Sequence, residues 1–401
     1  MPGLFLGRQP IFDRELRVFG YEIRSHLVQS QTEPVINDDL TTTHATLEKI
    51  FEVGLNTLVG GHWAFIRFTH RFFSGEFSLP FLSDRLILEI HDDNPFDEDF
   101  ENALGTLEKR GYQIALDDSL SYETIANLVR DNWFVRINIG QLIRPEIGWI
   151  IAQFKNKNVK LLAENVQTLD DFEFCKRLGF EYFQGIFLRK PNLLSGRKID
   201  TSRVTVLQAL AVTANENSDF PQLEKIISRD ITLSYKLLRL VNSVYYGSTD
   251  TVKSLQQAIA MIGLDQLRSW ITLILMSTVD DKQEELTSFA IIRAKMCELL
   301  ARSMGSENRE EFFLIGLLSI VDALMDLPME EVINNLSLSK EFVDGLLHQK
   351  GILGKVLNIV QLYENGDWDK LIEIEINPQT LCEAYINSIR WSNTIVNSMN
   401  E

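Results

Sequence analysis

Residues 112–140 read YQIALDDSLSYETIANLVRDNWFVRINIG, and this stretch has two short apolar runs on either side of a helix-like segment. The runs YQIALDD and FVRINIG have the length of short buried strands, whereas residues 120–130 between them have helical spacing. A strand, a helix and a second strand in this order are typical of an α/β fold with a largely parallel sheet. The stretch therefore predicts that fold class.

The same alternation extends over the whole first half of the chain. Helix-like segments separate most of the strand-like runs, and eight strands in about 190 residues predict a compact (β/α)8 barrel below the usual size. The other runs are GRQPIFD, FGYEIRS, WAFIRFT, RLILEI, VKLLAEN and YFQGIFL, and the other helical segments are 96–110, 143–157 and 167–178.

The second half of the chain has a different pattern. After the stretch RKPNLLSGRKIDTSR the strand-like runs disappear, and from Val204 onward the apolar positions recur at helical spacing. Segment 312–321, FFLIGLLSIV, is apolar on all sides and predicts one helix buried in a bundle. Within 286–303 one apolar stripe consists of Phe289, Ile292, Met296, Leu299 and Leu300.

Length and composition limit the possible functions. A chain of 401 residues is too long for one ordinary core, so we expect a barrel domain over 1–198 and an all-helical domain over 199–401. A net charge of −17 disfavours direct binding to nucleic acid or to an anionic membrane. Three widely spaced cysteines and the lack of any apolar run of signal-peptide or membrane-span length predict a cytoplasmic protein.

Polar side chains recur at the carboxyl ends of the predicted strands. Because these ends converge on one mouth of a barrel, we expect the side chains to meet there. Carboxylates so placed suit Mg²⁺ or Mn²⁺, and two such ions can activate water for phosphoryl displacement. Any single acid is more often a helix cap or a solvent-facing residue, but the set favours a site. The set is Glu22, Arg67, Glu89, Asp117, Asp118, Asn138, Glu164 and Gln184.

Several motifs occur in a fixed order along the first half. They are Gln9-Pro10-Ile11, Glu22-Ile23-Arg24, Glu89 in LILEI, Asp117-Asp118, Ala163-Glu164, and Gln184-Gly185 with Pro191 downstream. Over about residues 5–195 they resemble the motifs of the EAL domain, a barrel that hydrolyses the bacterial second messenger cyclic di-GMP. The resemblance implies metal ligands at Glu22, Glu89, Asp117, Asp118 and Glu164, and nucleotide-binding positions at Gln9, His26, Gln184 and Pro191.

Five departures from the family's pattern predict a degenerate enzyme with a vestigial metal site. Arg67 stands at a metal-binding asparagine position, where it would place a permanent positive charge, so Arg67→Asn should improve metal binding. Arg136 replaces a lysine that helps to position the water, and Asn138 replaces an aspartate. His26 replaces a phosphate-contacting arginine. The loop 119–122 lacks the glycines that would couple the metal site to dimerisation.

The second half contains three long helical motifs, ISRDITLSYKLLRLVNSVYYG, VKSLQQAIAMIGLDQLRSW and FLIGLLSIVDALMDLP. From about Val204 to Trp391 they resemble the HDOD domain, an all-helical relative of the HD phosphohydrolases. Where metal-dependent relatives have a His-Asp pair, this chain has Ser319-Ile320, which implies a degenerate HD position and an interaction module. Two interpretations of 242–247 stay open, a partner surface and a helix end capped by Gly247.

Three functions follow from these patterns. The first is a non-catalytic bacterial regulator linked to cyclic di-GMP signalling of the motility or biofilm type, which requires no cofactor. It would bind unidentified signalling proteins through the HDOD domain, and cyclic di-GMP and a second copy of the chain are further candidate partners. The alternative is an active or weakly active phosphodiesterase that uses Mg²⁺ or Mn²⁺. The acidic charge of the helical half disfavours the third, a nucleic-acid-linked regulator.

Overall fold

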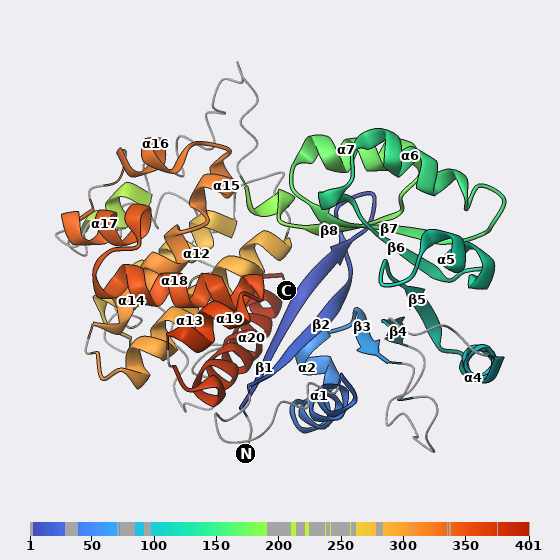
Figure 1. Cartoon of the computed structure of the whole chain (residues 1–401). Helices are drawn as coiled ribbons and strands as arrows, with labels where there is room; N and C mark the ends of the chain where they lie inside the picture. The colour runs from blue at the N-terminus through green and yellow to red at the C-terminus, as the bar shows by residue number, and fades with distance from the viewer. Residues whose placement is uncertain are drawn as a thin grey trace. The chain divides into compact units, whose positions relative to one another are not determined.

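The chain forms two compact units in the computed structural model (Figure 1). One unit contains Met1–Leu188 with Asn377–Cys382, and the other contains Arg189–Ile376 with Glu383–Glu401. The predicted boundary between 198 and 199 lies outside the described residues and stays a prediction, as do Pro191 and the segment 242–247. The structure describes residues 3–28, 39–69, 72, 85–91, 98–190, 210–213, 221–223, 237, 241, 257, 262–277, 284–306, 308–334, 336, 338–374 and 376–400.

The first unit is a closed eight-stranded barrel, which confirms the predicted fold class. Neighbouring strands from β2 to β8 are parallel, whereas β1 is antiparallel to both β2 and β8. Asp13 explains this exception, because its carboxylate accepts hydrogen bonds from the backbone N–H groups of Glu15 and Arg17 and closes a tight turn. The strands are β1 (Gly3–Phe12), β2 (Val18–Val28), β3 (Trp63–Phe68), β4 (Leu86–Ile90), β5 (Gln113–Leu116), β6 (Phe134–Asn138), β7 (Lys160–Val166) and β8 (Tyr182–Gly185).

Helices follow most strands at the predicted places. Side-chain caps define two of their starts, since Ser121 accepts from the backbone N–H of Thr124 and Thr168 accepts from that of Asp171. The prediction of 143–157 is too long, because after Ala152 the chain continues in tight i→i−3 turns. The helices are α1 (Asp39–Val53), α2 (Leu55–Val59), α4 (Glu98–Lys109), α5 (Tyr122–Leu128), α6 (Arg144–Ala152) and α7 (Leu169–Leu178), with short 3₁₀ turns η2 (Ile139–Gln141) and η3 (Phe187–Arg189).

The interior of the barrel contains an apolar layer between two polar ends. Since side chains alternate along a strand, every second residue of β3 to β7 faces the interior. Glu89 and Asp117 each lie two residues after a member of this layer, at the carboxyl ends of β4 and β5. Gln113 and Lys160, the first residues of β5 and β7, lie at the opposite end of the barrel. The buried layer consists of Ile11, Phe65, Ile87, Ala115, Phe134 and Leu162.

Every described element from Leu264 to Asn400 is a helix, as predicted for the second half. None of the described helices combines the length and apolar character of a membrane span. The helices are α12 (Leu264–Ser277), α13 (Glu284–Ser303), α14 (Arg309–Leu318), α15 (Val321–Met325), α16 (Met329–Asn334), α17 (Lys340–His348), α18 (Gly351–Asn365), α19 (Trp368–Glu373) and α20 (Pro378–Asn400).

Two expectations for this half are only partly correct. Of the predicted stripe, Ile292, Met296 and Leu300 are buried, whereas Phe289 and Leu299 are partly exposed. The buried helix predicted over 312–321 is present only as far as Leu318, where α14 ends, and α15 begins at Val321.

A serine side chain accounts for the break between α14 and α15. The Ser319 hydroxyl donates to the carbonyl oxygen of Gly316 at 2.7 Å. Such local hydrogen bonds compete with the helical ladder, and the next residue, Ile320, leaves the helical conformation with ψ 5°. Ser319 and Ile320, which were predicted to be a degenerate HD position, therefore lie at a helix junction.

Candidate functional site

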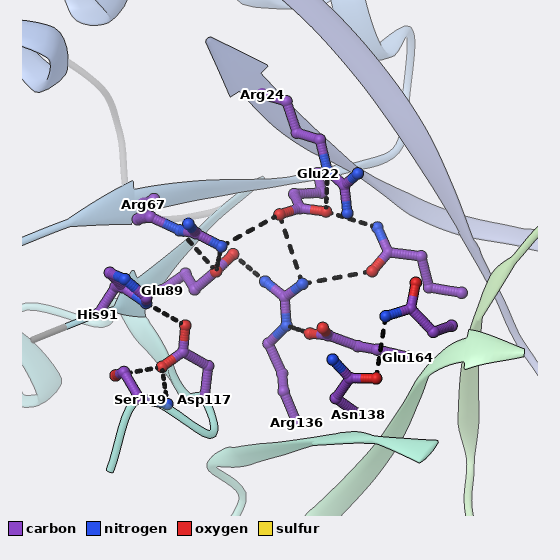
Figure 2. Close-up of polar contacts among 12 residues, drawn as sticks. Glu22, Arg24, Arg67, Glu89, His91, Asp117, Ser119, Arg136, Asn138 and Glu164 are labelled. Atoms are coloured by element: carbon purple, nitrogen blue, oxygen red, sulfur yellow. Dashed lines mark hydrogen bonds and ion pairs between the residues drawn. The ribbon is translucent and has the colours of Figure 1, made fainter. Parts of the chain in front are cut away.

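Most of the predicted strand-end residues meet at one mouth of the barrel (Figure 2). Strands β2, β4 and β7 contribute Glu22, Glu89 and Glu164, of which Glu22 is 2% exposed and Glu89 fully buried. From β8, the Gln184 amide donates to Glu22 Oε2 at 2.7 Å. The expected convergence of carboxylates is therefore present in the structure.

The guanidinium of Arg136 lies in the middle of these carboxylates (Figure 2). Its Nη1 is ion-paired with Glu89 and its Nε with Glu164, while its Nη2 lies 3.4 Å from Glu22 Oε1. Nη2 also donates to Gln184 Oε1 at 3.3 Å. The side chain is 1% exposed, and a charge buried this deeply is tolerated only when it is well paired. Arg136 is therefore a fixed cation at the centre of the ring.

Two further arginines lie at the rim of the mouth. Arg67 donates to Glu89 Oε1 from Nε at 3.1 Å and from Nη2 at 3.0 Å, yet 49% of its side chain is exposed. Arg24 donates from Nε to Glu22 Oε2 at 2.9 Å. Both Arg67 and Arg136 were predicted as departures at the site, and the structure places Arg136 deepest. Sequence reasoning missed Arg24, although its position two residues after Glu22 puts both on one face of β2.

These arginines determine the ionisation of Glu22. Burial by itself raises the pKa of a carboxyl group, but the positive charges of Arg24, Arg136 and Arg67 and the hydrogen bond from Gln184 outweigh it. The pKa of Glu22 consequently lies well below its ordinary value. The pKa of Glu164 is instead raised, because its burial and the charge of Glu22 exceed the effect of Arg136.

A second polar group lies beside the ring (Figure 2). His91 Nδ1 lies 2.7 Å from Asp117 Oδ2, while Ser119 donates to Asp117 Oδ1 from its hydroxyl at 2.5 Å and its backbone N–H at 3.1 Å. Burial opposes ionisation of Asp117, but the contacts with His91 and Ser119 prevail and lower its pKa. The neighbouring Asp118 is exposed, and its pKa is raised by partial burial and by the charge of Asp117. Sequence reasoning missed His91, which lies two positions after Glu89.

The lowered pKa of Asp117 predicts a pH-dependent contribution to stability. The unfolded chain takes up a proton near the ordinary value of 3.8, while the folded protein keeps the carboxylate ionised. This contribution to stability is thus present at pH values above the pKa of the unfolded chain. It is lost as the pH falls from that pKa toward the lower pKa of the folded protein. Asp117→Asn removes it at every pH. We expect the difference in urea midpoint between wild type and variant to be larger at about pH 5 than at about pH 3, and a difference that grows on acidification would contradict the account.

Three of the remaining predicted residues make no side-chain hydrogen bond or ion pair with the ring within the described part of the chain. Asn138 Oδ1 accepts from the Gly140 backbone N–H at 3.1 Å and from the Asn165 amide at 2.9 Å, so this side chain caps η2. His26 is partly exposed on β2, four residues after Glu22. Gln9 lies opposite Glu22 on β1, and within the described part of the chain its buried Oε1 has no hydrogen-bond partner.

The donor set does not fit a divalent cation as the side chains stand. Glu22, Glu89 and Glu164 would be suitable oxygen ligands, but all three already contact the guanidinium of Arg136. Among the described residues, no three His, Cys, Asp or Glu side chains are grouped so that they could hold a metal ion. Arg136 would have to leave the ring before a metal could enter.

An arginine also contacts the predicted HD position in the helical unit. Arg293 of α13 donates from Nη1 to the Ser319 hydroxyl at 2.9 Å, and its Nη2 lies 2.7 Å from Glu364 Oε2 of α18. The side chains of Arg293 and Glu364 are 8% and 2% exposed. Ile320 is buried, and burial raises the pKa of Asp322 close by. Sequence reasoning missed Arg293, although its position four residues after Phe289 and three before Met296 places this charge on the apolar stripe.

Comparison with known proteins supports the two-part organisation. Residues 200–331 match the model of the HDOD domain. The chain is 26% identical to the uncharacterized protein YuxH of Bacillus subtilis (strain 168), over 98% of this chain and 99% of YuxH. It is 29% identical to the cyclic di-GMP phosphodiesterase CdgJ of Vibrio cholerae serotype O1, over 98% of this chain and 93% of CdgJ.

Solved structures resemble the chain more weakly. A PaMucR phosphodiesterase–c-di-GMP complex is 19% identical and covers 50% of this chain and 99% of its own, with a TM-score of 0.37. The Bacillus subtilis YkuI protein, which has an EAL domain and is bound to c-di-GMP and calcium, is 16% identical and covers 64% of this chain and 72% of its own, with a TM-score of 0.36. Similarities this low say nothing about the chemistry of the mouth, which we infer from the chain's own side chains.

Proposed function

Since this chain joins an EAL-like barrel to an HDOD domain, we propose that it is a non-catalytic regulator in cyclic di-GMP signalling that acts through protein contacts. The observation that carries the proposal is the guanidinium of Arg136 bound to Glu22, Glu89 and Glu164. The five predicted metal ligands are then a vestigial site, and the protein requires no metal cofactor.

The chemistry of a guanidinium explains why such a site would not hydrolyse a phosphodiester. A divalent cation activates water by coordinating its oxygen, whereas arginine has only N–H donors and keeps its proton. Arg136 can thus neutralise the carboxylates without generating a nucleophile.

The charge of the mouth also disfavours tight binding of cyclic di-GMP. The nucleotide carries two phosphate charges, and in the mouth carboxylates still outnumber arginines. We therefore infer that the signalling link runs mainly through partner proteins that bind the HDOD domain, with outputs of the motility or biofilm type. We propose further that residues 1–198 and 199–401 are the two domains and that the protein forms a homodimer.

A second candidate function is a metal-dependent cyclic di-GMP phosphodiesterase. The name of CdgJ, which is similar over almost the whole chain, favours it, as do the retained carboxylates. In this case Mg²⁺ or Mn²⁺ would displace Arg136 from the ring when the substrate arrives.

Incubation of the purified chain with cyclic di-GMP and Mn²⁺ tests the two functions. We expect no linear dinucleotide, and calorimetry should detect little binding heat. The matched control is Glu22→Gln, which removes a carboxylate of the ring. Turnover by the wild type that disappears in Glu22→Gln would overturn the non-catalytic proposal, since a contaminating phosphodiesterase would be unaffected by the substitution.

A further inference from the structure

The end of the barrel opposite the carboxylate mouth contains a cavity of about 260 Å³. Its lining comes from the amino-terminal ends of the strands, and the buried apolar layer separates it from Arg136. An engineered apolar cavity of about 150 Å³ is enough to bind benzene, so this cavity has room for a six-membered ring with a substituent. The residues that matter here are Phe19, Trp63, Gln113, Phe134 and Lys160.

Aromatic rings form one side of the cavity. Phe19 and Trp63 are stacked with ring centroids 6.2 Å apart and an angle of 18° between their planes. The ring of Phe134 lies 5.9 Å from that of Phe19. Aromatic faces and edges grouped in this way favour contact with a planar ligand.

Three polar side chains line the cavity, and they are Gln113, Asn132 and Lys160. Lys160 Nζ lies 4.7 Å from the centre of the Phe134 ring and donates to Gln113 Oε1 at 3.3 Å, which leaves the Gln113 amide N–H₂ as a further donor. Within the described part of the chain, no carboxylate lies at ion-pair distance from Lys160, and Glu181 acts on it only at longer range. Burial lowers the pKa of Lys160, as expected for a partly dehydrated ammonium.

We propose that this cavity is a binding site for a small planar aromatic carboxylate. The ring of the ligand would contact Phe19, Trp63 and Phe134, and its carboxylate would accept hydrogen bonds from Lys160 and Gln113. A carboxylate supplies the counter-charge that the ammonium lacks, whereas a neutral ring would leave it uncompensated. Cyclic di-GMP does not suit this site, because the cavity is too small for two nucleotides. The site is independent of the function proposed above.

Benzoate is a suitable probe, and the full-length chain can be titrated with it by calorimetry and by ligand-observed NMR. We expect binding with a dissociation constant in the range of about 1 mM, as the small number of ligand atoms allows. Lys160→Met should weaken it about tenfold, and Lys160→Arg should largely restore it. Benzyl alcohol should bind the wild type about tenfold more weakly than benzoate, since it lacks the charge.

Two controls separate this site from the mouth and from misfolding. Arg67→Asn, at the opposite end of the barrel, should leave benzoate binding unchanged. In the wild type, nuclear Overhauser contacts should join benzoate to the indole of Trp63, and this measurement needs no variant. The proposal is overturned if the wild type does not bind benzoate at about 10 mM, if folded Lys160→Met binds it equally well, or if the contacts to Trp63 are absent.

Discussion

Arg136→Met is expected to lower the free energy of unfolding of the barrel by about 3–5 kcal/mol, because it removes the central cation from three carboxylates and leaves Glu164 with no arginine partner among the described residues. Glu22 and Glu89 are 2% and 0% exposed, so water cannot replace the lost charge. Methionine keeps much of the length of the side chain, which limits the contribution of an empty cavity. Hydrogen–deuterium exchange of the strand amides measures the effect in the barrel separately from the helical unit.

The same variant should acquire a response to divalent cations. With Arg136 removed, the oxygens of Glu22, Glu89 and Glu164 become available, and Mn²⁺ is a suitable ligand for such a group. Binding to the folded state alone stabilises it, so Mn²⁺ should restore part of the lost protection in Arg136→Met and change the wild type little. EDTA should reverse the effect.

Arg67→Asn is the matched comparison at the rim. Because 49% of the Arg67 side chain is exposed, its loss should lower stability by about 1 kcal/mol or less, with a smaller gain in Mn²⁺ response. A stronger Mn²⁺ response in Arg67→Asn than in Arg136→Met would show that Arg67, and not Arg136, is the main obstacle to metal binding. An Arg136→Met variant as stable as the wild type would show that Arg136 is not the cation on which the ring depends.

Arg293→Met is expected to destabilise the helical unit by a similar amount, about 3–5 kcal/mol, because it leaves Glu364 buried without a partner. The contact of two Arg293 nitrogens with the Glu364 carboxylate joins α13 to α18. The hydrogen bond from Arg293 to the Ser319 hydroxyl also links α13 to the junction after α14. Hydrogen–deuterium exchange of the backbone amides in α13, α14 and α18 measures this loss of stability.

A double-mutant cycle distinguishes the ion pair from simple packing. Arg293→Met with Glu364→Leu removes both charges, so the double variant should be more stable than Arg293→Met alone. Lys295→Met is a control on the same helix, since the Lys295–Glu298 pair is 20% exposed on each side and should contribute about 1 kcal/mol or less. Additive losses in the double variant would mean that Arg293 and Glu364 do not stabilise the bundle as a pair.

Much of the architecture was predictable because it depends on local patterns. Short apolar runs separated by helical segments determine an α/β barrel, and the run of helical spacing after Val204 determines a helical second half. The convergence of Glu22, Glu89 and Glu164 was predictable for a related reason, since parallel strands of a closed barrel bring their carboxyl ends to one mouth. The antiparallel start at β1 and the break at Ser319 were missed, because each depends on the hydrogen bonds of a single side chain.

The sequence alone therefore determined the two-part fold and the residues that gather at the mouth, whereas only the tertiary structure decided which charge lies at its centre. Arg67, Arg136 and Asn138 looked equivalent as departures from a motif. In the folded chain Arg136 contacts three carboxylates from three other strands, Arg67 lies at the rim, and Asn138 caps the following turn. The physical reason is that ion pairing depends on depth and on partners far apart in the sequence, and closure of the barrel determines both.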